Sequence, residues 1–168
     1  PSGGWLFAAP PGERPQPFTQ TLRLAERIAR PLHLASWDLL ALRSPGTPAA
    51  ILELLAADVP GRQDVYDAAA RRGADLLAAI QLDSGGWFSE MPLDDGRVPW
   101  WFRRLTWRVT LDDDVTPGAV RALLAMWERE RNEAYRLGAR RGLDLLHTAQ
   151  LPSGGFPITW RPAWLRRL

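Results

Sequence analysis

The sequence contains no cysteine and no lysine. The first absence excludes disulfide bonds and thiolate metal sites, although it does not identify a cellular compartment. The second means that all 21 basic residues are arginines, which raises the isoelectric point because arginine does not titrate in the usual range. The formal net charge is only +2, so we expect no nucleic-acid partner.

Long uncharged apolar runs are also missing. Even the apolar segment 49–59 contains Glu53 and Asp58, so we expect no membrane span. The hydrophobic content of 46% nevertheless predicts a packed globular protein. The sequence begins with proline and shows no basic and apolar leader, which leaves the localisation unknown at this point.

The sequence contains one glycine-rich motif twice, and we call it the glycine phrase. Residues 72–87 and 141–156 share Arg-Gly-x-x-Leu-Leu-x-x-x-Gln-x-x-Ser-Gly-Gly followed by an aromatic residue, with a separation of 69 residues. A truncated copy, Pro-Ser-Gly-Gly-Trp, occupies residues 1–5. Such repetition predicts copies of one supersecondary unit stacked side by side. We therefore expect one domain over residues 1–168, itself a fragment of a longer array, which consists of the partial repeat 1–46 and the repeats 47–115 and 116–168.

Each full repeat is predicted to begin with a helix. Thr47-Pro48 and Thr116-Pro117 are again 69 residues apart. In both pairs we expect the threonine to be the N-cap and the proline to lie in the first helical turn. Apolar residues follow at helical spacing in both copies.

A second helix is predicted in each repeat, over about 64–81 and 132–150. In the first of these, Val65, Leu76 and Ile80 fall on the apolar side. The paired glycines after each helix are expected to end it with a left-handed cap. Each repeat is thus a helical hairpin, and the predicted fold class is all-α.

Stacked hairpins form either an open solenoid or a closed α/α toroid. The Gln-x-x-Ser-Gly-Gly-Trp phrase is similar to phrases that end helices in toroid enzymes, including terpenoid cyclases and a family of polysaccharide lyases, so we expect an arc of an α/α toroid. Trp5, Trp87 and Phe156 stand at equivalent positions of the copies and are predicted to lie in the core. The segments 5–36 and 87–114 are predicted to be long loops that carry the site.

The segment 110–116 reads Thr-Leu-Asp-Asp-Asp-Val-Thr. It resembles the Thr-Ile-Asp-Asn-(Gly/Asp)-Ala-Thr motif of the pectic acid lyases, polysaccharide lyase family ten. The helix at 120–125 and the glycine phrase at 141–157 follow in the order of that family, and the resemblance covers about residues 64–160. Terpenoid cyclases of the protonating class carry Asp-x-Asp-Asp instead, which this sequence does not match.

The resemblance implies β-elimination of polygalacturonate-type chains with calcium as cofactor and an acidic polysaccharide as partner. The family's calcium-binding aspartate corresponds to Asp112, and Asp113 stands where the family has an asparagine that touches substrate. Asp112, Asp113 and Asp114 are therefore the predicted metal ligands, and Asp113 is also a predicted substrate contact. The family's catalytic arginine lies beyond the next hairpin, so the catalytic residue of this chain is unknown. A true pectate lyase would be secreted or periplasmic.

Another interpretation of the three aspartates stays open. Acidic residues just before a helix are favoured by capping and by the helix dipole. Three adjacent like charges exceed what capping needs, and they repel one another unless a cation lies among them.

The segment 100–108 mixes tryptophans with arginines. Arg103, Arg104 and Arg108 are predicted to contact substrate, because guanidinium groups pair with carboxylates in a bidentate manner. Alternatively, the aromatic residues pack between hairpins while the arginines extend into solvent.

Three functions remain at this point. The first is a pectate lyase-like domain. The second is a non-catalytic carbohydrate-binding or scaffold domain of the same fold, and the third is a terpenoid cyclase-like toroid.

Overall fold

The computed structural model describes residues 38–93, 97–100, 102 and 108–162. The predictions for Trp5, for the loop 5–36 and for Arg103 and Arg104 lie outside these residues. In the part described, the order of elements is β1, α2, α3, β2, β3, α5, α6 and β4.

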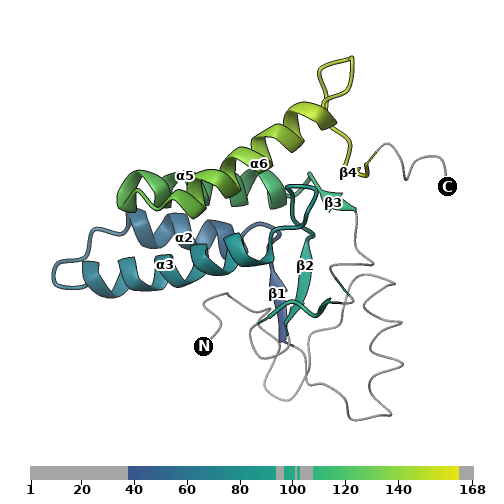
Figure 1. Cartoon of the computed structure of the whole chain (residues 1–168). Helices are drawn as coiled ribbons and strands as arrows, with labels where there is room; N and C mark the ends of the chain where they lie inside the picture. The colour runs from purple at the N-terminus through teal and green to yellow at the C-terminus, as the bar shows by residue number, and fades with distance from the viewer. Residues whose placement is uncertain (1–37, 94–96, 101, 103–107, 163–168) are drawn as a thin grey trace, which may run out of the picture.

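The helices form two hairpins, as predicted. The first consists of α2 (Thr47–Ala56) and α3 (Gln63–Ile80), and the second of α5 (Val115–Glu130) and α6 (Glu133–Ala149). The second hairpin lies against the first, with α5 packed on α2 and α3 and with α6 packed on α3 (Figure 1). Adjacent hairpins are therefore shown, whereas closure into a toroid stays a prediction.

Four short strands amend the all-α prediction. β1 (Asp38–Ala41) pairs antiparallel with β2 (Glu90–Leu93), and β3 (Val109–Thr110) pairs antiparallel with β4 (Thr159–Trp160). The described chain is mostly helical, but the segment 87–114 is not wholly irregular. Strands of two to four residues leave too little periodicity to be read from sequence, and their partners are distant along the chain.

The threonine caps were predicted wrongly. Thr47 is the first residue of α2, and no side chain caps that helix, whose N-cap position is Gly46. Thr116 lies inside α5, where its hydroxyl donates to the Thr110 carbonyl at 2.7 Å and accepts from the Trp87 amide at 3.3 Å. The buried hydroxyl of Thr116 thus joins α5 to β3 and to the first glycine turn instead of capping a helix.

The glycine caps were also placed wrongly. α3 and α6 end at Ile80 and Ala149, and the next residues, both glutamines, have an extended backbone. The left-handed residues come later, at Gly85 (φ +94°) and Gly154 (φ +87°). Each lies in a tight turn after the helix, which we call a glycine turn, over residues 82–86 and 151–155. In the first, the Gly85 amide donates to the Leu82 carbonyl at 2.9 Å.

The core lies between the two hairpins and under the first glycine turn. Trp87 is completely buried there, as predicted. Phe156, its counterpart 69 residues later, is 52% exposed, so its predicted core position is wrong. Val65 is also wrongly predicted, because it is 57% exposed near the start of α3. A repeated sequence position is buried only where a neighbouring element covers it.

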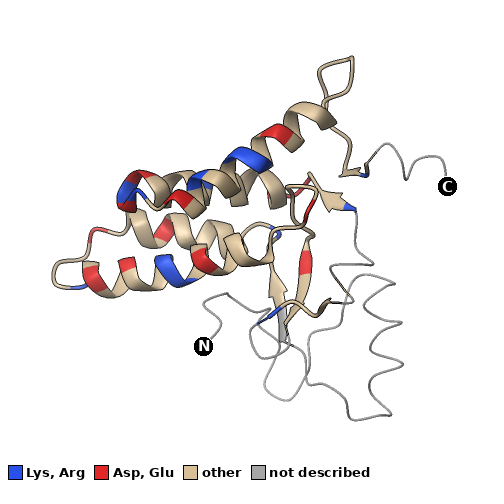
Figure 2. Cartoon of the chain, viewed as in Figure 1, with Lys and Arg blue, Asp and Glu red and all other residues tan. Residues whose placement is uncertain are grey.

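Polar contacts join the two hairpins at their loop ends. Arg71 of α3 pairs with Glu130, and Asp67 pairs with Arg129, both with a closest distance of 2.7 Å. The hydrogen bond from Arg129 lowers the pKa of Asp67. Basic and acidic residues are interspersed along the helices in this view (Figure 2). Among the described residues, no helix is both long enough and apolar enough to cross a membrane.

Tyr135 provides a further link, which yields a stability prediction. Its hydroxyl donates to Asp75 Oδ1 at 2.6 Å, its side chain is 1% exposed, and burial raises its pKa. Tyr135→Phe is expected to lower the free energy of unfolding by about 1–2 kcal/mol, because a hydrogen bond to a carboxylate is lost. Urea unfolding followed by circular dichroism measures this change. The control is Tyr66→Phe at the equivalent position of α3, and an equal loss in both variants would contradict the assignment.

Candidate functional site

The candidate site is the end of the hairpins where α2 and α5 begin. All four strands lie at this end, away from the loops that join the two helices of each hairpin (Figure 1). The first turns of α2 and α5 approach closely, since a Cβ on Gly118 would lie 3.4 Å from Pro48 Cβ. The helix N-termini carry partial positive charge, which favours the acidic loop 112–114 that precedes α5.

Asp112 is the first of the two exposed residues of this acidic loop, Asp112 and Asp113. Its backbone amide and that of Leu111 both donate to the Ile158 carbonyl, at 3.4 and 2.9 Å. The segment after the second glycine turn therefore holds the loop in place. The Asp112 carboxylate forms no ion pair with another described residue, so it is available to a ligand.

Asp113 and Asp114 both have a left-handed backbone, with φ values of +46° and +59°. The Asp113 carboxylate lies 3.3 Å from Arg43 Nε, and its carbonyl accepts from the Ser44 amide at 3.0 Å. The Asp114 carboxylate accepts a hydrogen bond from Arg121. Left-handed non-glycine residues are uncommon and tend to occur where surrounding contacts hold them in place.

The three carboxylates of the loop therefore do not converge. Within the ranges that the structure describes, no group of three or more histidine, cysteine, aspartate or glutamate side chains is arranged to hold a metal ion. Capping does not explain the loop either. Asp114 occupies the N-cap position of α5, but its side chain makes no capping hydrogen bond.

Arg43 is the functional candidate that the sequence interpretation missed. It precedes α2 and pairs with Asp113, which joins the loop before α2 to the loop before α5. The repeat offered a signal, because Arg43 lies 69 residues before Asp112. The same turn is thus basic in one copy and acidic in the next, and the two turns are neighbours.

Arg108 is the predicted substrate-contacting arginine that the structure describes. It is half-buried and lies directly before β3, two residues before the segment 110–116 that contains the acidic loop. It makes no ion pair with other described residues, so its guanidinium is available for a carboxylate.

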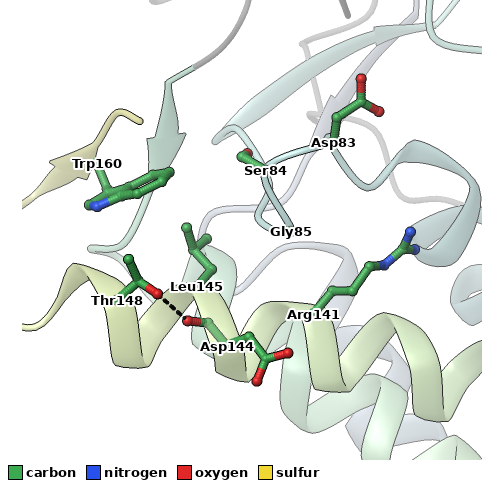
Figure 3. A pocket seen from close by; sticks show the side chains of 8 residues that line it. All are labelled: Asp83, Ser84, Gly85, Arg141, Asp144, Leu145, Thr148 and Trp160. Carbon is green, nitrogen blue, oxygen red and sulfur yellow. Dashed lines mark hydrogen bonds between the residues drawn. The ribbon is translucent and has the colours of Figure 1, made fainter. Parts of the chain in front are cut away.

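A cavity of about 250 Å³ lies between the first glycine turn and α6, and sequence reasoning did not find it. Trp160 lies at one end of the cavity, near Leu145 and Thr148. Arg141 lies at the other end, beside Gly85 (Figure 3). The complete lining is Asp83, Ser84, Gly85, Arg141, Asp144, Leu145, Thr148 and Trp160.

Two polar atoms on this lining, Ser84 Oγ and Trp160 Nε1, are buried without a hydrogen-bond partner among the described residues. Buried polar atoms are usually paired, so both can serve a ligand or an ordered water. An aromatic ring, a hydroxyl and a guanidinium can contact a sugar, but Asp83 and Asp144 also line the cavity, so an anionic sugar would need a cation beside them. Trp160 also links the cavity to the acidic loop, because it pairs with Val109 three residues before Asp112.

These features define a class: a mostly helical repeat protein with an acidic loop and a small polar cavity at one end. Residues 97–163 match the sequence model of a known family, the pectic acid lyases. This segment contains the acidic loop, α5, α6 and the second glycine turn, but it is less than half of the 168-residue chain. The predicted resemblance is thereby confirmed for this segment and stays a prediction for residues 64–96. No curated protein matches the chain.

Proposed function

We propose that this chain binds polyuronate with the help of calcium, as part of a polysaccharide lyase. The observation that carries the proposal is the match of residues 97–163 to the pectic acid lyases. The matched segment includes the exposed Asp112 and the cavity residues Arg141 and Trp160. At the coarse level, a pectate-lyase-like family indicates a polysaccharide substrate.

Of the three predicted metal ligands, Asp112 is the one whose carboxylate is not paired with an arginine of the described residues. Calcium prefers six to eight oxygen ligands, several of them from carboxylates. Asp113 and Asp114 are engaged by Arg43 and Arg121, so Asp112 alone offers an uncommitted carboxylate. Asp112 would hold the ion together with ligands from outside the described residues and from the substrate. When bound, calcium would neutralise the uronate carboxylate and make the neighbouring C5 proton more acidic.

The arginines of the site would orient the substrate. Arg108 is free of ion pairs with described residues and can receive a uronate carboxylate. Asp113, predicted both as metal ligand and as substrate contact, is held by Arg43 at 3.3 Å, so it serves either role only after this pair opens. The two side chains are 39% and 53% exposed, so solvent screens part of their attraction, but Arg43 Nε itself is buried and gains little water when the pair opens.

No described arginine is assigned as the base that removes the C5 proton. A non-catalytic carbohydrate-binding domain of the same fold is therefore the second candidate. The engagement of Asp113 and Asp114 by arginines favours it, because two of the three predicted metal ligands are occupied.

The test is calorimetric titration of the chain with polygalacturonate oligomers, with calcium and with a chelator. We expect calcium-dependent binding that Asp112→Asn weakens about tenfold or more, since a ligand carboxylate is lost. Asp58→Asn, an exposed residue in the loop between α2 and α3, is the control and should leave the affinity unchanged.

Ultraviolet absorbance of unsaturated uronate in the same mixtures separates the two candidates. Product formation supports elimination, whereas calcium-dependent binding without product supports the non-catalytic domain. If polygalacturonate fails to bind in the presence of calcium, or if Asp112→Asn binds as tightly as the unchanged chain, the proposal is wrong.

A further inference from the structure

We infer that the surface formed by α6 and the second glycine turn is a docking surface for a further helical hairpin of the same repeat. We call this surface the α6 face. It carries five large exposed apolar side chains, 45–69% exposed: Leu137, Leu143, Leu151, Phe156 and Ile158. The interface between the two described hairpins indicates what covers this face, because α6 packs there on α3 and against the first glycine turn.

Burial differs sharply between equivalent residues of the two copies. Leu82 is 3% exposed and Leu151, 69 residues later, is 45% exposed. Ser89 is 5% exposed, whereas its equivalent Ile158 is an apolar residue that is 69% exposed. Apolar side chains in register with a buried interface indicate a second interface of the same kind.

The glycines of the two turns show the same difference at the backbone. A Cβ on Gly85 would lie 2.5 Å from the Arg141 carbonyl of α6, and one on Gly86 would lie 2.5 Å from Leu145 Cδ2. Among the described residues, a Cβ on Gly154 would have no atom within 4 Å, and one on Gly155 would have only the Ser153 hydroxyl, at 3.8 Å. The second turn therefore has the same left-handed glycine as the first, but no helix of the described part of the chain packs against it.

The glutamines of the two glycine phrases, Gln81 and Gln150, differ in their hydrogen bonds. Gln81 Nε2 donates to Gly85 of its own turn at 2.7 Å and across the interface to the Gly138 carbonyl of α6 at 2.8 Å. Gln150 Nε2 makes the equivalent bond to Gly154 at 3.0 Å. It has no second partner among the described residues, so one donor hydrogen is available for the kind of bond that Gln81 makes to Gly138.

Charged and polar residues specify the occupant further. The Asp75 carboxylate of α3 accepts a hydrogen bond from the Tyr135 hydroxyl. The equivalent Asp144 is exposed, so an occupant of the same kind would place a hydroxyl donor beside it. Arg71 pairs with Glu130, and the equivalent Arg140 is 70% exposed and lies no closer than 4.0 Å to Asp144. The occupant is thus a hairpin with a glycine-bearing helix, a hydroxyl near its start and an acidic residue opposite Arg140.

A second copy of this chain meets these requirements only in part. If α3 took the place of a third helix, Tyr66 would stand opposite Asp144 and Gly73 would provide the close approach. The position equivalent to Glu130, however, is Gly61, which leaves Arg140 without an acidic partner. We therefore assign the α6 face to a further hairpin with the pattern of α5 and α6, not to a second copy.

The absence of cysteine allows a direct test by thiol labelling. Single cysteines replace Leu151 on the α6 face and Val59 between α2 and α3, which have similar exposures of 45% and 42%. Labelling rates are compared between the 168-residue chain and a lengthened chain in which residues 94–162 are repeated in register directly after Pro162. The added copy supplies the required glycines, tyrosine and acidic residue.

We expect labelling of Leu151→Cys to slow by about tenfold or more in the lengthened chain, with Val59→Cys unchanged. Gly138→Leu in the added copy alone should restore the fast rate, because a Cβ at this position lies 3.0 Å from Leu123 Cδ1 and 3.6 Å from Gln81 Oε1, so a larger side chain keeps the helix from its own partner and from the glutamine. Equal labelling of Leu151→Cys in both chains would overturn the inference, as would no gain of helical circular dichroism on lengthening. Protection that appears in the 168-residue chain and increases with its concentration would show that a second copy covers the face instead.

Discussion

Trp87→Ala is expected to lower the free energy of unfolding by about 3–5 kcal/mol, a large fraction of the total stability of a domain of this size. Trp87 is completely buried, and its Nε1 donates to the Leu77 carbonyl at 2.9 Å. Its ring also lies 3.3 Å from where a Cβ on Gly142 would stand, so it fills the space between the two hairpins. Truncation removes this ring, leaves a cavity and deprives a buried carbonyl of its donor.

The matched control is Phe156→Ala, at the equivalent position of the second copy. Phe156 is 52% exposed, so its truncation is expected to change stability by less than about 1 kcal/mol. Urea unfolding of both variants, followed by far-ultraviolet circular dichroism, measures the difference. A similar loss in both would show that the α6 face is covered within the 168-residue chain, and a small loss in Trp87→Ala would contradict the described core.

Gly85→Ala is expected to lower the free energy of unfolding by about 2–5 kcal/mol, for two reasons that add. The left-handed φ of +94° disfavours any side chain, which costs about 1–2 kcal/mol. The new methyl group would also stand 2.5 Å from the Arg141 carbonyl oxygen, and backbone atoms of α6 cannot rotate out of its way. Such overpacking adds about 1–3 kcal/mol and pushes the two hairpins apart.

Gly154→Ala separates these two contributions. Its φ is +87°, but no atom of the described segments lies within 4 Å of its Cβ position. It is therefore expected to lose only the conformational part, about 1–2 kcal/mol. The difference between the variants in thermal or urea unfolding measures the close packing of α6 against the first turn. Equal losses in the two variants would mean that the glycines are retained for backbone conformation alone.

Much of the helical structure could be predicted from the sequence. The predicted ranges 64–81 and 132–150 differ by one residue at each end from α3 and α6. This worked because an apolar stripe with helical spacing is a local property, and because the repeat supplied each pattern twice. The acidic loop was also found from local residues, since three adjacent aspartates before a helix are conspicuous in any context.

Contacts across hairpins could not be predicted in the same way. The pairing of β1 with β2 joins segments about 50 residues apart through strands of four residues, too short to show a period. The Arg43–Asp113 pair and the cavity beside Trp160 likewise depend on how one hairpin lies on the other. The roles assigned to Thr47 and Thr116 failed for a related reason, because Thr116 bonds to a neighbouring strand that a local pattern does not contain.

The sequence by itself determined the repeat, its helices and the resemblance to pectic acid lyases, all of which rest on residues close together in the chain. Only the tertiary structure decided which copy of each repeated residue is buried. Trp87 and Phe156 carry the same local signal, yet one is in the core and the other is half exposed. The physical reason is that burial belongs to a pair of surfaces, and α6 covers the first glycine turn while no described residue does the same for the second.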